Sequence, residues 1–400
     1  MQNNVKTIIV SGGWGYGNLG DDALLAATST LLKSTFPDAK IIWTSYDIDF
    51  TKSSGIDLDG ELVPSVHRLL RGEEAFRELS TAGKVFNIFQ FPYYLRRTIE
   101  KYIYPISRLF LRKPNKEDNR LDQGRMQEYF AQSAIFLMSG GGYFNQWEGM
   151  FQARVRELKL AHEAGCKVVL FGQSIGSFTS AQKRELQATF RAGDRIFVRD
   201  PDSVAELKEM GFLAELIPDI AMMEFRQLTM RPRAVCLIPA ELTPGQIKSL
   251  VKELSELDNI IVNVILTRLI YPDIVTAKRV YKQLRRHAKF PVYLHIPRNY
   301  KEMLSCIEGS EWILSRGLHG MILGWRSGSN VFALTTSRKV DGFLRAIGCP
   351  ANQLAEAEWA GRLGQLLKEC LRKPVPFDEE KRQDISCKIQ EGFERAMDSK

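Results

Sequence analysis

Short apolar runs alternate with longer amphipathic stretches along most of the chain. Lys40–Ser45 is one such run, and residues 134–139 and 167–171 are two more. Runs of about four to eight apolar residues between helices are typical of parallel strands that are buried on both faces. The stretches between them, such as residues 148–164, repeat their apolar residues at helical spacing. The pattern therefore predicts an α/β fold built from doubly wound parallel sheets.

The alternation occurs twice, and a polar stretch at residues 224–233 separates the two series. A chain of 400 residues is also too long for one ordinary core. We therefore expect two Rossmann-like domains, residues 1–225 and 226–372, that face each other across a cleft. Residues 373–400 are expected to form a C-terminal helix capped by Asp378, and its packing back on the N-terminal domain is left open.

A segment of about residues 60–127 interrupts the first series, and we expect a helical insertion in the N-terminal domain there. Its middle, from Phe86 to Lys113, contains eight aromatic residues, six basic residues and one acidic residue, a net charge of +5. The formal charge of the whole chain is +8, so most of the excess lies in this segment. Aromatic rings among Lys and Arg suit the headgroup layer of an anionic membrane. A helical hairpin packed on its own domain is the structural alternative.

Composition narrows the class of protein further. Hydrophobic residues make up 44% of the chain and charged residues 26%, as in globular proteins. No apolar run approaches the roughly 18 residues of a membrane span. The six cysteines form no C-x-x-C pair, which fits a reducing cytoplasm, and the five histidines show no metal-binding spacing. We expect a cytoplasmic protein without a metal and without a nucleic-acid partner, with peripheral association at the inner face of the membrane left open.

A glycine-rich loop follows the first predicted strand. Its G-x-G-x-x-G glycines are Gly15, Gly17 and Gly20. This spacing after a strand and before a helix can bind a dinucleotide phosphate. However, Asp21 and Asp22 follow at once, and acidic side chains there repel a bound phosphate. An acceptor-sugar loop is therefore favoured over a nucleotide loop or a plain turn capped by Asp21.

Two more glycine loops follow later strands of the first series. Gly140, Gly141 and Gly142 are consecutive, and successive exposed N–H groups can form a nest for an anion. Residues 172–176, which include Gln173, follow the next strand. Because parallel strands end at the same edge of a sheet, we expect all the loops to meet there.

Charged residues also follow predicted strands. Arg199 comes before Asp200 and Pro201, which predict the start of a helix, and Asp219 follows the next strand. In the second series, Arg316 and His319 lie between a strand and a helix. A histidine at a helix start can transfer protons while nearby N–H groups hold an anion. Lys339, after the next strand, adds a cation.

Together these motifs resemble the polysaccharide pyruvyl transferase family. The matching stretches are residues 15–24 (GYGNLGDDAL), 140–142 (GGG), 172–176 (GQSIG), 198–200 (VRD), 218–221 (PDIA), 318–320 (LHG) and 339–340 (KV). They occur in the order of the family and span residues 7 to about 348. The family has a fold similar to that of the two-domain GT-B glycosyltransferases. It moves the enolpyruvyl unit of phosphoenolpyruvate onto two hydroxyls of one sugar and releases phosphate.

The resemblance and the positions of the residues give each candidate a role. The expected catalytic residues are His319 as proton shuttle, Arg316 and Asp21. The expected donor-binding residues are Arg199, Lys339, Gly317 and Gly320. The expected acceptor-binding residues are Gly15, Gly17, Asn18, Gly140, Gly141, Gly142, Gln173 and Asp219. Phosphoenolpyruvate is the co-substrate and no cofactor is implied. The acceptor is a saccharide of exopolysaccharide, capsule or cell-wall synthesis, with lipid linkage or nucleotide linkage and the oligomeric state left open.

Two departures from the family pattern lie on the donor side. The family usually has Arg directly before Leu-His, whereas Gly317 fills that place here and Arg316 lies one residue earlier. The tyrosine and acid that often precede the family's lysine are Thr336 and Ser337 here. Three alternatives therefore stay open: a GT-B-like glycosyltransferase that uses a sugar nucleotide, a catalytically inactive binding member of the family, and a nicotinamide oxidoreductase.

Overall fold

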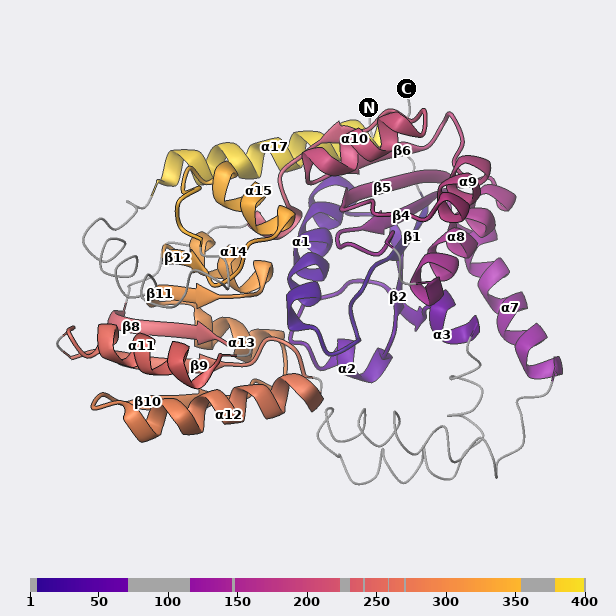
Figure 1. Ribbon diagram of the computed structural model, residues 1–400. Coiled ribbons are helices and arrows are strands. Elements are labelled where there is room, and N and C mark those ends of the chain that lie inside the picture. The colour runs from indigo at the N-terminus through magenta and orange to yellow at the C-terminus, as the bar shows by residue number, and fades with distance from the viewer. Residues whose placement is uncertain are drawn as a thin grey trace. The chain divides into compact units, whose positions relative to one another are not determined.

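The computed structural model describes residues 6–70, 116–145, 148–223, 231–239, 242–257, 259–269, 271–353 and 378–398 (Figure 1). The chain divides into two compact units. The first unit comprises Met1–Gly17, Leu24–Ile220 and Lys388–Lys400, and the second comprises Asn18–Ala23 and Ala221–Cys387. The main division thus falls at Ile220, where the sequence led us to expect residue 225. Asn18–Ala23 and Lys388–Lys400 each belong to the unit that does not contain their neighbours in sequence.

The first unit has a seven-stranded parallel sheet in its described part, in the order β3-β2-β1-β4-β5-β6-β7. The strands are β1 (Thr7–Ser11), β2 (Lys40–Ser45), β3 (Glu61–Pro64), β4 (Ile135–Ser139), β5 (Lys167–Gln173), β6 (Arg195–Val198) and β7 (Glu215–Leu216). All five residues of β1 are buried, as are all five of β4. The order reverses between β1 and β4, and a doubly wound sheet binds its ligands outside the carboxyl ends of the strands at such a point.

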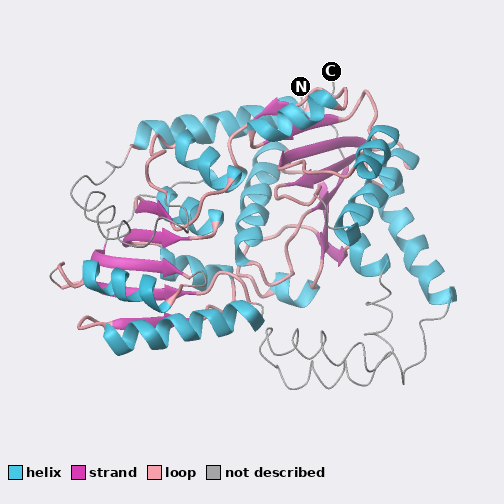
Figure 2. Ribbon diagram, viewed as in Figure 1, coloured by secondary structure: helices cyan, strands magenta, loops and turns pink. Residues whose placement is uncertain are grey.

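Helices lie along the strands of this sheet (Figure 2). They are α1 (Leu19–Thr35), α2 (Ile48–Lys52), α3 (Val66–Leu70), α7 (Lys116–Ala131), α8 (Glu148–Glu163), α9 (Ser180–Thr189) and α10 (Pro201–Glu209). The C-terminal helix, α17 (Glu379–Met397), ends in the same unit, where Phe393 packs edge-on against Phe171 of β5 with ring centroids 5.1 Å apart. Helices along the sheet explain why the central strands β1 and β4 are buried at every position.

The second unit repeats the plan with five parallel strands in its described part, in the order β10-β9-β8-β11-β12. The strands are β8 (Arg231–Ile238), β9 (Ile261–Ile265), β10 (Val292–His295), β11 (Ser310–Ser315) and β12 (Asn330–Ala333). The helices are α11 (Pro244–Leu254), α12 (Tyr271–His287), α13 (Tyr300–Ile307), α14 (Leu318–Arg326) and α15 (Arg338–Ala346), and a 3-10 turn, η1 (Ile220–Met222), joins the units. Here the order reverses between β8 and β11. The predicted α/β class and the two doubly wound sheets are confirmed.

Local capping rules set several helix starts. Asp200 accepts a hydrogen bond from the Ser203 N–H, with Pro201 at the first helical position, as predicted. Asp378 accepts one from the Lys381 N–H at 2.8 Å. The less favoured alternative, a plain turn capped by Asp21, is wrong. Helix α1 begins at Leu19, and the Asn18 side-chain oxygen accepts from the Gly20 N–H at 3.3 Å, while Asp21 lies in the first turn.

The first residues of the expected insertion are part of the main sheet. Glu61–Pro64 pairs in parallel with β2 as the edge strand β3. The sequence does not reveal this strand because it is four residues long and only Val63 in it is buried. The aromatic and basic segment from Phe86 to Lys113 lies outside the described residues, so its membrane role stays a prediction. Within the described residues, no helix has both the length and the apolar character needed to cross a bilayer.

Two glycines of the second unit provide a matched test of helix packing. A methyl group on Gly324 of α14 would lie 2.3 Å from Ile313 Cγ1 of β11, whereas one on Gly342 of α15 would meet nothing within 4 Å. We expect Gly324→Ala to destabilise the protein by about 1–3 kcal/mol through overpacking. Gly342→Ala should instead stabilise it by about 0.5–1 kcal/mol, because alanine is the better helix former. Urea unfolding of both variants checks this, and equal midpoints would contradict the packing.

Candidate functional site

Two of the glycine loops are joined at the carboxyl edge of the first sheet. The Gly140 N–H donates to the Phe171 carbonyl at 2.8 Å, and the Ser174 N–H donates to the Gly141 carbonyl at 2.7 Å. The loop after β1 reaches the same place. A methyl group on Gly13 would lie 2.1 Å from the Tyr143 hydroxyl, and one on Gly141 would lie 2.1 Å from the same ring. The Tyr143 ring therefore lies against Gly13 of the loop after β1 and against Gly141 of its own loop. At both positions a side chain larger than that of glycine would collide with the ring.

The Gly140–Gly142 loop departs from the expected anion nest in one respect. Gly140 and Gly141 have positive φ values of 59° and 84°, which suit such a turn. However, the N–H group of Gly140 already donates to a backbone carbonyl. The Gly140 N–H, which we expected to be the first donor of an anion nest, therefore connects this loop to the end of β5 instead.

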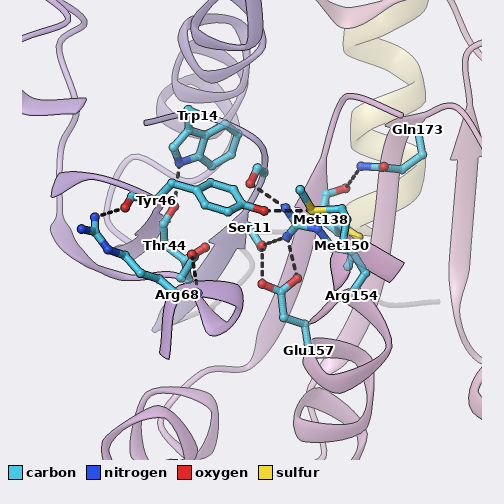
Figure 3. A network of polar contacts seen from close by, with 12 residues as sticks. Ser11, Trp14, Thr44, Tyr46, Arg68, Met138, Met150, Arg154, Glu157 and Gln173 are labelled. Atoms are coloured by element: carbon cyan, nitrogen blue, oxygen red, sulfur yellow. Dashed lines mark hydrogen bonds and ion pairs between the residues drawn. The ribbon is translucent and has the colours of Figure 1, made fainter. Parts of the chain in front are cut away.

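A buried ion pair lies behind this edge (Figure 3). Arg154 and Glu157 lie about one helical turn from each other on α8. The Arg154 Nη1 and Glu157 Oε2 atoms are 2.6 Å apart, and each side chain is 1% exposed. The Ser11 hydroxyl at the end of β1 donates to Glu157 at 2.8 Å and accepts from Arg154. Arg154 also donates to the Gly12 carbonyl at 2.7 Å and lies 4.8 Å from the centre of the Tyr143 ring. One guanidinium thus connects α8, the end of β1 and both glycine loops.

Electrostatics keep the Arg154 guanidinium charged. Burial acts to lower the pKa of Arg154, but the attraction and hydrogen bond of Glu157, together with Tyr46 and Tyr143, outweigh it, so the pKa lies above its ordinary value. A buried ion pair adds little net stability, because two charges lose their hydration. Removing one partner is costly, since it leaves an uncompensated charge in the interior. The pair therefore fixes one arrangement of the loops.

Packing determines the shape of the loop after β1. Trp14 is fully buried, and its indole N–H donates to the Thr44 carbonyl at 2.6 Å. A methyl group on Gly15, whose φ is 80°, would lie 2.5 Å from the Ser45 hydroxyl oxygen and 2.7 Å from the Asp47 nitrogen. Gly15 is therefore required by close backbone packing rather than by the approach of a phosphate. Gly17 also has a positive φ, of 81°.

Arg199 and Asp219 form a second buried ion pair in the first unit. The Arg199 Nη1 and Asp219 Oδ2 atoms are 2.6 Å apart, and the side chains are 5% and 8% exposed. The Nε atom of Arg199 donates to the Ser174 hydroxyl at 2.8 Å. The structure thus joins a residue expected on the donor side to one expected on the acceptor side. Gln173, another expected acceptor residue, is fully buried and its amide donates to the Met138 carbonyl at 3.2 Å (Figure 3).

The second unit brings the expected catalytic histidine against the start of α1. His319 is the second residue of α14, immediately after β11. A methyl group on Gly20 would lie 2.4 Å from the Nδ1 atom of His319, so the imidazole lies directly on this glycine. Arg316 is exposed in the turn before α14. Gly320 packs against β8, since a methyl group there would lie 2.1 Å from Ile238 Cδ1.

The turn that carries Gly20 is held by its own contacts. The Asn18 amide donates to Asp21 Oδ2 at 2.9 Å, and the Leu19 N–H donates to the Thr267 carbonyl at 3.0 Å. Asn18 and Asp21 are therefore fixed next to the glycine that contacts His319. Lys339 is exposed in the first turn of α15. Within the described residues, no three His, Cys, Asp or Glu side chains are grouped as a metal ion would require.

Four residues of this site were not expected from the sequence: Trp14, Tyr143, Arg154 and Glu157. Arg154 and Glu157 have the i, i+3 spacing of many exposed helical pairs, which gives no sign of burial. Trp14 and Tyr143 lie inside the glycine loops, and this position was the one available signal. Their importance becomes visible only when β1 and β4 are neighbours in the sheet.

A comparison with models of known protein families identifies the family of this chain. The family model described as polysaccharide pyruvyl transferase matches residues 18–338. A search of curated protein sequences found no match.

Solved structures show the same fold at low identity. UDP-GlcNAc 2-epimerase from Neisseria meningitidis, bound to UDP-GlcNAc, is similar with a TM-score of 0.58 and 11% identity, covering 98% of this chain and 97% of that one. The Anabaena protein HepE, in complex with UDP and glucose, has a TM-score of 0.53 and 10% identity, covering 99% and 96%. A glycosyltransferase from Rickettsia africae has a TM-score of 0.51 and 12% identity, covering 98% and 93%. The predicted two-domain fold of the GT-B type is confirmed.

The buried ion pair can be tested by neutralising one partner. Glu157→Gln leaves the Arg154 guanidinium charged in the interior, and we expect a loss of about 3–5 kcal/mol in the free energy of unfolding. Glu163→Gln on the same helix is the matched control, because its side chain is 57% exposed and lies 3.9 Å from Arg156. It should change stability by less than about 0.5 kcal/mol. Similar urea midpoints for both variants would contradict a buried pair.

The contact between Gly20 and His319 gives a second test. We expect Gly20→Ala to shift the ring resonances of His319 in NMR spectra, because the new methyl group displaces the imidazole. Gly245→Ala, in the first turn of α11, is the control, since a methyl group there would come no closer than 3.9 Å to Thr243 Oγ1. Unchanged His319 resonances in Gly20→Ala would show that the two residues do not touch.

Proposed function

The chain belongs to the polysaccharide pyruvyl transferase family, and we propose that it transfers the enolpyruvyl unit of phosphoenolpyruvate to two hydroxyls of a saccharide. The product is a pyruvate ketal, and phosphate is released. The observation that carries this proposal is the contact between His319 and Gly20. It puts a proton-transfer group next to the turn that holds Asn18 and Asp21, two residues assigned to the acceptor and to catalysis.

The reaction needs proton transfer at two points. The first hydroxyl oxygen attacks C2 of the enol while C3 gains a proton and becomes a methyl group. The second hydroxyl oxygen then attacks C2, and the C2–O bond to phosphate breaks. The two hydroxyl protons balance the proton gained at C3 and the one that leaves with phosphate. We assign the proton transfers to His319, with Asp21 as base or acceptor ligand, since imidazole changes charge near neutral pH.

The donor carries a carboxylate and a phosphate, so it needs cations and N–H donors. Arg316 and Lys339 are exposed at the carboxyl edge of the second sheet. The first turn of α14, with Gly317 and Gly320, offers the positive end of a helix to an anion. We assign these four residues to the donor. Arg316 lies one residue earlier than in the family pattern, and a methyl group on Gly317 would come no closer than 3.8 Å to the Ser315 hydroxyl oxygen. The place of the family's arginine therefore has room for a side chain.

Arg199 is the remaining cation assigned to the donor, and its ion pair with Asp219 limits how it can act. A guanidinium has five N–H donors, so Asp219 and Ser174 can hold it in a fixed orientation while other N–H groups meet an anion. In this arrangement Asp219 can bind the acceptor only if its ion pair with Arg199 breaks. We therefore give Asp219 the task of orienting Arg199.

The biological setting of the proposal is polysaccharide synthesis in the cytoplasm. The family supports a saccharide acceptor, and we assign this acceptor to an exopolysaccharide, capsule or cell-wall polymer. A lipid-linked acceptor agrees with membrane association through the segment from Phe86 to Lys113, whose net charge is +5. Binding of the chain to anionic vesicles, and its loss when this segment is deleted, is the direct measurement of that association.

One observation favours a second candidate function. The structures of the epimerase and of HepE contain UDP-GlcNAc or UDP and glucose. A glycosyltransferase that uses a sugar nucleotide is therefore the alternative within this fold. The released group separates the two: inorganic phosphate from phosphoenolpyruvate indicates pyruvyl transfer, and free nucleotide from a sugar nucleotide indicates glycosyl transfer.

The role of His319 is tested by turnover with phosphoenolpyruvate and a set of lipid-linked and nucleotide sugars, with product detected by mass spectrometry. We expect His319→Ala to reduce kcat about 10²–10⁴-fold, the usual contribution of one proton-transfer group. His287→Ala is the control, because His287 is exposed at the end of α12. Near wild-type turnover in His319→Ala would remove the assignment, and phosphate release without a ketal product would point to hydrolysis of the donor.

A further inference from the structure

Aromatic side chains follow three neighbouring strands of the first sheet. Tyr16 lies in the loop after β1, Tyr46 directly follows β2, and His67 lies in α3 after β3. The ring centroids of Tyr16 and Tyr46 are 5.6 Å apart, and those of Tyr46 and His67 are 5.2 Å apart. Since β3, β2 and β1 are adjacent in the sheet, the three rings form a row at its carboxyl edge.

Tyr16 is the exposed member of this row. Tyr16 is 48% exposed, whereas Tyr46 is 3% exposed. Gly15 and Gly17 flank Tyr16 with φ values of 80° and 81°, a backbone conformation that other residues adopt at a cost. The loop therefore turns sharply on both sides of Tyr16 and leaves this residue about half exposed to solvent. An exposed aromatic ring offers an apolar face on which the apolar face of a ligand can pack.

The support beneath Tyr16 is rigid. The hydroxyl of Tyr46 donates to the sulfur of Met150 at 2.9 Å, and its backbone carbonyl accepts from the buried Arg68 guanidinium (Figure 3). The Tyr46 N–H donates to the Trp14 carbonyl at 3.3 Å. Tyr16 rests edge-to-face on this fixed ring, with an interplanar angle of 69°. A ligand that packs on Tyr16 meets a surface that is already ordered, so little conformational entropy is lost on binding.

We propose that Tyr16 is the stacking surface for a pyranose ring of the saccharide acceptor. One face of many pyranoses presents C–H groups, while their hydroxyls point outward around the ring. Such a face packs on an aromatic side chain, and the hydroxyls remain available for reaction. The identity of the ligand as the acceptor rests on the proposed function, whereas the stacking surface itself rests on the exposure and support of Tyr16. A nucleobase also has a flat face, and the experiment distinguishes it from a sugar.

The experiment uses the full-length chain and three variants. Tyr16→Ala removes the ring, Tyr16→Phe keeps it, and Tyr293→Ala is the matched control, since Tyr293 on β10 of the second unit is 52% exposed. Saturation-transfer NMR measures binding of the methyl pyranosides of glucose, galactose, mannose and N-acetylglucosamine, and of uridine monophosphate. We expect Tyr16→Ala to weaken binding of at least one pyranoside about tenfold or more. Tyr16→Phe and Tyr293→Ala should bind like the wild-type protein, and thermal unfolding verifies that each variant is folded.

The outcomes separate the two proposals. Unchanged pyranoside binding by a folded Tyr16→Ala variant overturns the stacking role, as does a wild-type protein that binds none of the four pyranosides. A loss confined to uridine monophosphate overturns it in favour of a nucleobase. If pyranoside binding depends on Tyr16 but phosphoenolpyruvate is never turned over, the stacking surface stands and the proposed function fails. If turnover occurs, Tyr16→Ala should raise the KM for the acceptor and leave the KM for phosphoenolpyruvate unchanged.

Discussion

Parallel pairing of the strands determines how loops meet in both units of this protein. Every strand pair in the described part of both sheets is parallel. Each chain reversal must therefore cross over the sheet, and every strand of a sheet ends at the same edge. Loops far apart in sequence, such as those after β1 and β4, become neighbours for this reason alone. In the first unit the loops after β1 and β4 lie where the strand order reverses, and in the second unit Arg316 and His319 follow β11, which pairs with β8 at the reversal.

Within the first unit, buried charge fixes what the sheet brings together. Arg154 and Glu157 carry opposite charges into the buried interior, and each is compensated by the other and by Ser11. Such a pair is a poor source of stability but penalises any arrangement that separates its members. Because Arg154 also holds the Gly12 carbonyl and lies on the Tyr143 ring, this penalty extends to both glycine loops.

The two units differ in the chemistry that they present at their carboxyl edges. At this edge the first unit has aromatic rings and backbone groups, and Tyr16 is exposed next to Tyr46. The nearby arginines of this unit form ion pairs or donate to backbone carbonyls. The second unit presents Arg316, His319 and Lys339. An apolar ring suits the face of a sugar, whereas cations and an imidazole suit an anionic donor that must exchange protons.

The amino-acid pattern was enough to predict the alternation of strands and helices, the two doubly wound sheets, and the glycine loops and charged residues at the strand ends. These features are local, because apolar runs, caps and turn residues act over a few positions. The tertiary structure decided what each loop residue does. Gly15 and Gly20 have the spacing of a phosphate loop, yet one packs against Asp47 and the other against His319. Arg199 pairs with Asp219, 20 residues away, and the short strand β3 joins the main sheet. These contacts depend on which strands become neighbours and which charged side chains become buried. The spacing of residues along the chain specifies neither.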